Sequence, residues 1–293
     1  MRRAAEAVCH GAVTVVNAMA TGRGAAVGVN MWTRARVTLT DCPDSIVVHN
    51  LTYPDVDTRL TKATVKRVFR QYGAELKFGA IVETTSNIPV AVGLKSSSAA
   101  SNAIALDTVS ALGRAASESS VVNMAVDASL KADVTLTGAF DDAMACFAGG
   151  LVITDNSRRR ILKRSRLEER ARVLIHIPRS RRYSKDVDRQ RLRPITSVVE
   201  AAHREALRGN YWLALTLNGA AYARALDLDS QAADRALEAG AIAAGLSGKG
   251  PAVAAIVPTR CVDEVLSSWS SLPGRVIETS FNHRKARSRR LAT

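Results

Sequence analysis

Hydrophobic and polar residues alternate along 33–41, where Ala35, Val37 and Leu39 share one side of an extended chain. Side chains of a β-strand point to opposite faces in turn, so this pattern predicts a strand with one buried face. Shorter β-rich or apolar runs predict further strands at 45–49, 76–83, 151–153, 172–177, 252–257 and 275–279.

Apolar residues recur at helical spacing in 195–207, where Ile195, Val199 and Ala202 fall on one side and Gly209 follows the end. This spacing predicts an amphipathic helix that ends at a glycine. Helical spacing or composition predicts further helices at 57–72, 96–112, 118–131, 211–226, 230–239 and 262–269. Strands and helices are mixed in both halves of the chain, so the expected fold class is a two-domain α+β protein.

The composition changes near residue 156, where a basic segment begins, and this predicts domains at 1–156 and 157–293. The 293 residues carry a net charge of +14. Between Ser157 and Pro194 there are 15 Arg or Lys against 4 Asp or Glu, and the tail 283–290 adds 5 more basic residues. Nucleic-acid modules usually interleave such charge with aromatic residues, whereas this segment holds only Tyr183. We interpret the charge as a solvated face plus a frayed tail; attraction of anionic substrates is an alternative, and nucleic-acid binding is disfavoured.

Other features of the composition favour a cytoplasmic enzyme. No apolar run approaches the roughly 18 residues of a membrane span, and no signal-peptide pattern follows the first residues. The 4 cysteines and 5 histidines show no metal-ligand spacing, which indicates buried or incidental thiols. The sequence does not determine the oligomeric state.

The segment 89–100, PVAVGLKSSSAA, leads a glycine-containing loop into a helix that begins with three serines. The first amides of a helix have no intrahelical acceptor, and the helix dipole adds partial positive charge there, so such an end binds phosphate. Lys95 is placed to neutralise charge on a polyphosphate. The GxxxxGK[ST] pattern of the Walker A loop is absent from the chain. A plain Ala-rich helix with a serine cap is the alternative.

Two further segments carry candidate chemistry. Residues 245–252, GLSGKGPA, form a second glycine-rich loop directly before a predicted strand, and such a loop presents main-chain amides inward. Residues 137–143, TGAFDDA, place Asp141 and Asp142 side by side. Paired carboxylates supply a general base, a metal ligand or a helix cap.

The order PxxxGLxSSxA, acidic segment, GLSGxGP resembles the GHMP kinases, which include galactokinase, homoserine kinase and mevalonate kinase. Residues 11–26, together with GLKSSSA and TGAFDDA, are most similar to the archaeal shikimate kinases of that superfamily. The resemblance spans 11–256. It implies an S5-like N-terminal domain, a ferredoxin-like C-terminal domain, and ATP and Mg²⁺ as cofactors. The implied reaction is phosphorylation of the 3-hydroxyl of shikimate to shikimate 3-phosphate; a GHMP kinase for another small alcohol, such as homoserine or mevalonate, is the alternative.

The resemblance also implies roles for individual residues. The phosphates of ATP would lie over the loop, whose residues are Pro89, Gly93, Leu94, Lys95, Ser96, Ser97, Ser98 and Ala99. Ser98 would be a magnesium ligand, with Asp127 and Asp133 as open candidates for a second one. GHMP kinases usually place six residues between the catalytic acid and a Gly-Gly pair, which favours Asp142 as the base and leaves Asp141 as the alternative. Asp141 would orient the lysine, cap a helix or hold the substrate.

The substrate residues are expected in the two motifs that flank the phosphate loop. Arg23 is the first choice for a carboxylate partner, because its planar guanidinium can pair bidentately. Asn17 and Thr21 would bind hydroxyls, and Gly248 and Lys249 would approach the carboxylate or the phosphate. A rival from another class, a basic nucleic-acid-binding protein with an S5-like domain, would need neither glycine loop; a kinase-like protein without activity is a further alternative.

Overall fold

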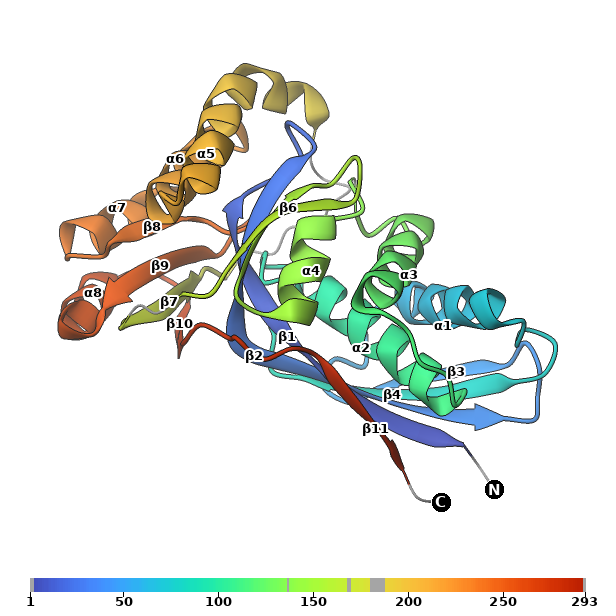
Figure 1. Cartoon of the computed structure of the whole chain (residues 1–293). Coiled ribbons are helices and arrows are strands. Elements are labelled where there is room, and N and C mark those ends of the chain that lie inside the picture. The colour runs from blue at the N-terminus through green and yellow to red at the C-terminus, as the bar shows by residue number, and fades with distance from the viewer. Residues whose placement is uncertain (1–2, 136, 168–169, 180–187, 292–293) are drawn as a thin grey trace.

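A computed structural model describes residues 3–135, 137–167, 170–179 and 188–291. The chain forms two layers, each a β-sheet with its helices. In the first layer, a seven-stranded sheet, the strands lie in the order β11-β1-β2-β4-β3, and β5 pairs with β2 and β6 with β5 (Figure 1). The pairings are antiparallel except for the parallel pair β3–β4. The strands are β1 (Ala4–Val16), β2 (Arg23–Thr40), β3 (Ile46–Asn50), β4 (Gly79–Ser86), β5 (Leu151–Asp155), β6 (Arg160–Ser165) and β11 (Arg287–Leu291).

Four helices pack on this sheet: α1 (Arg59–Tyr72), α2 (Ser96–Ala111), α3 (Glu118–Lys131) and α4 (Phe140–Ala148). Helices α2 and α4 lie directly on β1 and β2, and α1 and α3 pack against α2. Helix α2 is buried on most of its surface, which its Ala-rich sequence permits because small side chains allow close approach of neighbouring elements.

The second layer is a four-stranded sheet in the order β10-β7-β9-β8, formed by β7 (Ala171–Ile177), β8 (Ala243–Leu246), β9 (Val253–Pro258) and β10 (Arg275–Thr279). Its helices are α5 (Thr196–Arg208), α6 (Tyr211–Ala225), α7 (Gln231–Glu238) and α8 (Val262–Trp269), with 3₁₀ turns at Arg189–Ile195 and Thr259–Cys261. Helix α6 contacts β8 of this sheet and β1 of the first, so it joins the two layers.

The predicted helices and strands are confirmed, and the strand predicted at 33–41 is the second half of the long β2. Strand β1 was not predicted, because much of it is buried on both faces and shows little apolar–polar alternation. The boundary at 156/157 stays a prediction. Strands β6 and β11 lie beyond it in sequence and nevertheless pair within the first sheet.

The prediction of a frayed C-terminal tail is wrong for the residues up to 291. Strand β11 pairs with β1, and Arg289 forms an ion pair with Glu6. Just before this strand, the main-chain N–H of Ala286 donates a hydrogen bond to the carbonyl of Phe147 at 2.6 Å. The tail therefore holds the C-terminal end of α4. The sequence of β11 alone, rich in exposed arginines, looks like that of an unstructured tail. The hydrogen bonds that order it come from β1, at the opposite end of the chain, and a local pattern does not reveal them.

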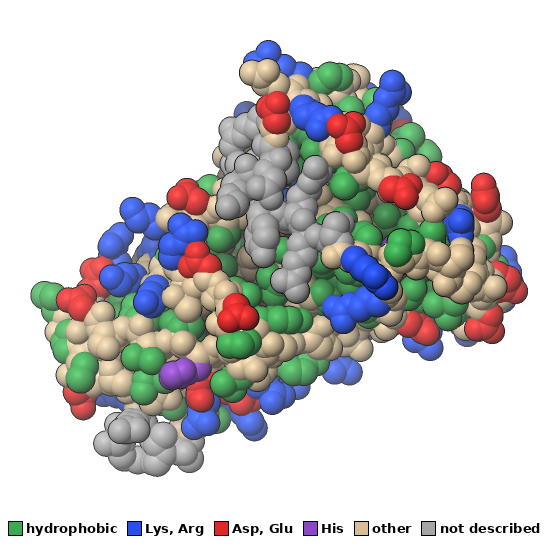
Figure 2. All heavy atoms as spheres, turned by 180° about the vertical axis from the view of Figure 1, so that it is seen from behind, with side chains coloured by type: hydrophobic (Ala, Val, Ile, Leu, Met, Phe, Trp, Pro, Cys, Tyr) green, Lys and Arg blue, Asp and Glu red, His purple; other side chains and the backbone are tan. Residues whose placement is uncertain are grey.

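Much of the basic segment also has partners. Arg158, Arg159, Arg164, Arg172 and Arg191 form ion pairs with Asp155, Asp127, Glu118, Glu278 and Asp227 respectively. On the face seen in Figure 2, Lys and Arg side chains are likewise interspersed with Asp and Glu. Exposed pairs of this kind contribute little free energy each, about 0–1 kcal/mol. Among the described residues, no helix is long and apolar enough to cross a membrane.

Asp107 is a carboxyl group fully buried between α2 and the sheet. Burial raises its pKa to about 9, and the charge of Glu6 adds to the rise, whereas the nearby main-chain N–H of Val37 and the charge of Arg36 oppose it. An aspartate in an unfolded chain has a pKa of about 3.9. Between these two values the folded state holds one more proton than the unfolded state, so this group lowers the free energy of unfolding as the pH rises.

We therefore expect Asp107→Asn to reduce the loss of stability at high pH. The free energy of unfolding of the variant, relative to the original chain, should rise by roughly 1 kcal/mol per pH unit between about pH 5 and 8. Urea unfolding at several pH values measures this difference, with Asp55→Asn at an exposed position as the control. Parallel pH curves for Asp107→Asn and the original chain would contradict the burial argument.

Candidate active site

One cavity is formed where the first sheet, α2, α4 and the second glycine loop meet. Ten of the residues singled out from the sequence line it: Asn17, Gly93, Lys95, Ser96, Ser97, Ser98, Asp141, Asp142, Gly248 and Lys249. They come from segments as far apart in sequence as Asn17 and Lys249, so the fold brings the separate motifs into one place.

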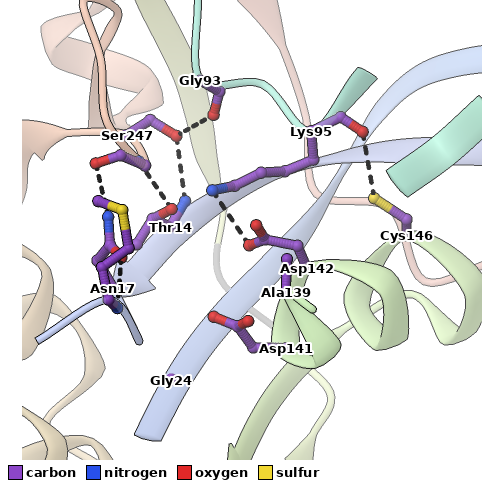
Figure 3. A network of polar contacts seen from close by, with 12 residues as sticks. Thr14, Asn17, Gly24, Gly93, Lys95, Ala139, Asp141, Asp142, Cys146 and Ser247 are labelled. Atoms are coloured by element: carbon purple, nitrogen blue, oxygen red, sulfur yellow. Dashed lines mark hydrogen bonds and ion pairs between the residues drawn. The ribbon is translucent and has the colours of Figure 1, made fainter. Parts of the chain in front are cut away.

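Ser247 joins the two glycine loops to β1. Its hydroxyl donates a hydrogen bond to the carbonyl of Gly93 at 2.8 Å and accepts one from the main-chain N–H of Thr14 at 3.2 Å (Figure 3). A Cβ atom at position 93 would overlap the carbonyl oxygen of Ser247, and φ of Gly93 is +93°. Glycine is therefore required there, because both the close approach and the left-handed backbone exclude a side chain.

The N-terminus of α2 opens into the cavity. Lys95 precedes the helix with φ +65°, and its carbonyl accepts the first helical hydrogen bond, from the N–H of Ala99 at 2.9 Å. Ser96, Ser97 and Ser98 form the first turn and line the cavity. Amides at such an end point outward together with the positive end of the helix dipole, an arrangement that binds phosphate groups.

Lys95 and Asp142 form an ion pair across the cavity, with 3.1 Å between Nζ and Oδ1. Both side chains are largely shielded from water, at 7% and 16% exposure. A Cβ atom at Gly248 would lie 2.8 Å from Nζ of Lys95, so the second glycine loop leaves room for the lysine. The partner of the lysine is thus Asp142, whereas the sequence analysis offered this orienting role to Asp141.

Asp141 lies deeper than Asp142, with only 3% of its surface exposed. Burial raises the pKa of its carboxyl, and the negative charge of Asp142 adds to the rise, while Lys95 and a hydrogen bond from Asn156 oppose it. The side chain points toward Gly24 on β2 (Figure 3). A Cβ atom at position 24 would overlap Oδ2 of Asp141 and lie 2.6 Å from its Cγ.

Asn17 follows β1 and is held by hydrogen bonds to helix α6 and to the second glycine loop. Its main-chain N–H donates to Oδ1 of Asn218 at 2.9 Å, and its side-chain Nδ2 donates to the carbonyl of Gly248 at 2.8 Å. The hydroxyl of Tyr222 donates to the carbonyl of Asn17 at 3.1 Å and accepts from the N–H of Ala20 at 2.9 Å. Asn218 and Tyr222, both on α6, therefore fix the bend between β1 and β2.

The remaining predicted residues lie elsewhere. Thr21 and Arg23 are outside the lining of this cavity as described: the hydroxyl of Thr21 bonds to the main chain of Arg23, whose side chain is exposed. The pKa of His203 on α5 is lowered by burial and, to a smaller extent, by the charge of Arg23. Pro89, Leu94 and Ala99 are buried and support the loop from beneath.

Residues 59–150 match the family model described as the GHMP kinases N terminal domain. The shikimate kinase of Methanosarcina mazei is 44% identical over 279 residues, which are 94% of each chain. The shikimate kinase of Methanothrix thermoacetophila is 44% identical over 281 residues, covering 96% of this chain and 95% of the relative. The chain belongs to the archaeal shikimate kinase family of the GHMP kinases.

Solved GHMP kinases share the fold at low identity. The mevalonate kinase of Methanococcus jannaschii has a TM-score of 0.76 at 13% identity, over 94% of this chain and 98% of that chain. The galactokinase of Lactococcus lactis, solved with galactose, has a TM-score of 0.76 at 11% identity, over 97% and 95% of the two chains. These similarities confirm the predicted GHMP kinase fold. As a member of this kinase family the protein is a phosphotransferase, for which ATP is a substrate.

A second cavity adjoins the first and shares Ser96 and Ser97 with it. Its walls include Tyr53, Val56 and Ile88 beside hydroxyl residues, a mixture suited to a nucleoside. The sequence analysis did not identify this cavity, because β3, β4 and α1 contribute to it without a motif.

Oxygen donors in the first cavity suit a hard cation. The hydroxyl of Ser98 lines it, and Mg²⁺ takes oxygen ligands, some of which come from substrate phosphates. Asp127 is engaged in ion pairs with Arg67 and Arg159 at 2.9 and 2.7 Å. Neither Asp127 nor Asp133 lies on the described lining of the cavity. In the described parts of the chain, no cluster of three or more His, Cys, Asp or Glu forms a self-contained metal site.

Because Gly24 leaves space for the Asp141 carboxylate, Gly24→Ala should displace that side chain. We expect kcat/KM for kinase activity to fall about 100-fold, since a shift near 1 Å in an active site can cost that much. Steady-state kinetics and thermal unfolding would be compared with Gly11→Ala, where the nearest atom to an added Cβ is the flexible end of Ile88 at 3.3 Å. If Gly24→Ala, like Gly11→Ala, kept the activity of the original chain, the placement of Asp141 would be unimportant for catalysis.

Proposed function

We propose that this protein is a shikimate kinase, which transfers the γ-phosphoryl group of ATP to the 3-hydroxyl of shikimate and releases shikimate 3-phosphate. The observation that carries the proposal is the Lys95–Asp142 ion pair in the cavity at the N-terminus of α2. It places a cation and a proton acceptor beside an anion-binding helix end. The near-full-length similarity to relatives named shikimate kinase favours shikimate over homoserine or mevalonate.

The nucleotide is proposed to occupy both cavities. Its phosphates would accept hydrogen bonds from the first amides of α2, and its nucleoside would enter the adjoining cavity through the shared Ser96 and Ser97. The Ser98 hydroxyl is the proposed protein ligand of Mg²⁺. When bound, the ion would neutralise charge on the phosphate oxygens, which is its usual contribution to phosphoryl transfer.

Asp142 is proposed as the group that accepts the proton of the attacking hydroxyl. It is more exposed than Asp141 and lies 3.1 Å from Nζ of Lys95, and both side chains line the cavity in which the phosphates are proposed to lie. Asp141 would support this group from beneath. A cytoplasmic location, where ATP is available, is proposed from the sequence features alone.

The substrate is proposed to lie between the bend after β1 and the second glycine loop. Asn17, Gly248 and Lys249 line that side of the cavity, where the second hydrogen of the Asn17 amide and the Lys249 ammonium group would donate to hydroxyls and the carboxylate. Lys249 is the proposed carboxylate partner. Arg23 and Thr21 stay secondary candidates, since their side chains lie outside the described lining.

The central test measures ADP release with ATP, Mg²⁺ and each of shikimate, homoserine and mevalonate. We expect turnover with shikimate alone and a loss of about 10²- to 10⁴-fold in kcat for Asp142→Asn, because a general base is removed. The loss should be smaller for Asp141→Asn, and Asp133→Asn is the control. Absence of turnover with every alcohol, while ATP still binds, would overturn the shikimate assignment. A greater loss in Asp141→Asn would reverse the roles of the two carboxylates.

Substitution of Lys249 and of Arg23 tests which of these basic residues binds the carboxylate of shikimate. Lys249→Ala should raise KM for shikimate about tenfold or more, with a smaller effect on KM for ATP, because one charge-assisted hydrogen bond to the carboxylate is lost. Arg23→Ala should change KM for shikimate less. The opposite ranking in steady-state kinetics would restore Arg23 as the carboxylate partner.

A further inference from the structure

Asn156 makes an unusual pair of contacts with the first turn of α4. Its Nδ2 donates a hydrogen bond to Oδ1 of Asp141 at 2.7 Å, and its Oδ1 accepts one from the main-chain N–H of the same residue at 3.1 Å. One side-chain amide thus holds both the carboxylate and the backbone of Asp141. Asn156 is 4% exposed, so water does not compete effectively for these bonds.

The surroundings of Asn156 fix the direction of its amide. The hydroxyl of Thr154 donates to Oδ1 at 2.6 Å, and the main-chain N–H of Asn156 donates to the carbonyl of Gly22 at 2.8 Å. If the amide were reversed, its NH₂ group would face the N–H of Asp141 and its oxygen would face a carboxylate. Only one orientation is compatible with this arrangement of donors and acceptors.

We propose that Asn156 is a positioning residue for the phosphoryl transfer: by holding Asp141 and the first turn of α4, it keeps Asp142 directed toward Lys95. The inference rests on the proposed function, because it assigns these carboxylates to catalysis. Asn156 lies 15 residues from Asp141 in sequence and acts through that residue.

Several charged or titratable groups face Asp141. Asp142 on α4 and Lys95 before α2 act on its charge directly. Tyr222 on α6 and Cys146 on α4 lie close enough for Asp141 to contribute to the rise in their own pKa values, after burial as the main cause. Asn156 is the side-chain hydrogen-bond donor in this set, and its bond favours the ionised carboxylate.

Asn156→Ala would remove that donor and give a readout that a purely structural role would not change. Two neighbouring carboxylates titrate in two steps, so losing a donor to Asp141 raises the higher of the two apparent pKa values of the pair. We expect the acid limb of the kcat/KM profile for shikimate, which follows the doubly ionised pair, to move upward by about one to two pH units, the equivalent of one hydrogen bond to a charged group. Thr154→Val, which removes only the hydroxyl that orients the amide, should give a smaller shift in the same direction.

Asn102→Ala is the matched control. Asn102 is also buried, and its Nδ2 donates at 2.8 Å to α4, but to the carbonyl of Ala143 and not to a carboxylate. Both variants should lose a similar amount of thermal stability, whereas Asn102→Ala should leave the acid limb in place. Equal midpoints in Asn156→Ala, Thr154→Val and the original chain would overturn the proposal.

A direct titration separates this inference from the proposed function. The ¹³C signal of the Asp141 carboxyl, assigned by its loss in Asp141→Asn, should titrate about one to two pH units higher in Asn156→Ala than in the original chain. This measurement needs no turnover. If shikimate is not phosphorylated, the kinase assignment fails while the signal still tests the contact; if the signal does not move, the positioning role fails even in an active enzyme.

Discussion

The side chains of Lys95, Asp141 and Asp142 lie together in a small volume that is largely shielded from solvent. The surrounding structure must therefore stabilise two carboxylates and one ammonium group there. A buried charge without a partner costs several kcal/mol, so each must be compensated. Lys95 compensates Asp142 at 3.1 Å, and Asn156 donates to Asp141 at 2.7 Å. Both carboxylates also lie in the first turn of α4, where the helix dipole favours negative charge. Gly24 leaves space for the carboxylate of Asp141, and Gly248 leaves space for the ammonium group of Lys95.

This requirement explains why the backbone is strained at the site. Lys95 and Ala139 each precede a helix with φ of +65° and +49°, values that cost a residue with a side chain roughly 1–3 kcal/mol. The two turns bring the N-terminal ends of α2 and α4 to the same cavity. The strain is held by packing elsewhere: the tail 282–286 bonds to the far end of α4, and Ser247 holds the loop before α2.

The two layers depend on each other through the same cavity. The second glycine loop follows β8 of the second sheet, yet its Gly248 lies beside the ammonium group of Lys95 and bonds to Thr14 near the end of β1. Helix α6 fixes the bend that carries Asn17. Neither layer alone contains a complete site. In such an arrangement, small movements of one sheet against the other would change the distance between the nucleotide and its acceptor, which is the geometry on which phosphoryl transfer chiefly depends.

The sequence by itself determined the class of fold, most helices and strands, the glycine loops and the acidic pair, because hydrophobic periodicity and short motifs are local properties. It also indicated which motifs act together, through their resemblance to a family. Only the tertiary structure decided which carboxylate pairs with Lys95, that Arg23 is exposed and outside the described lining of the cavity, and that Asn156, Asn218 and Tyr222 hold the site. Asn218 and Tyr222 act on residues about 200 positions away. The direction of a side chain on a strand, and the partner of a buried polar group, depend on what packs against them, and that is not encoded in any local pattern.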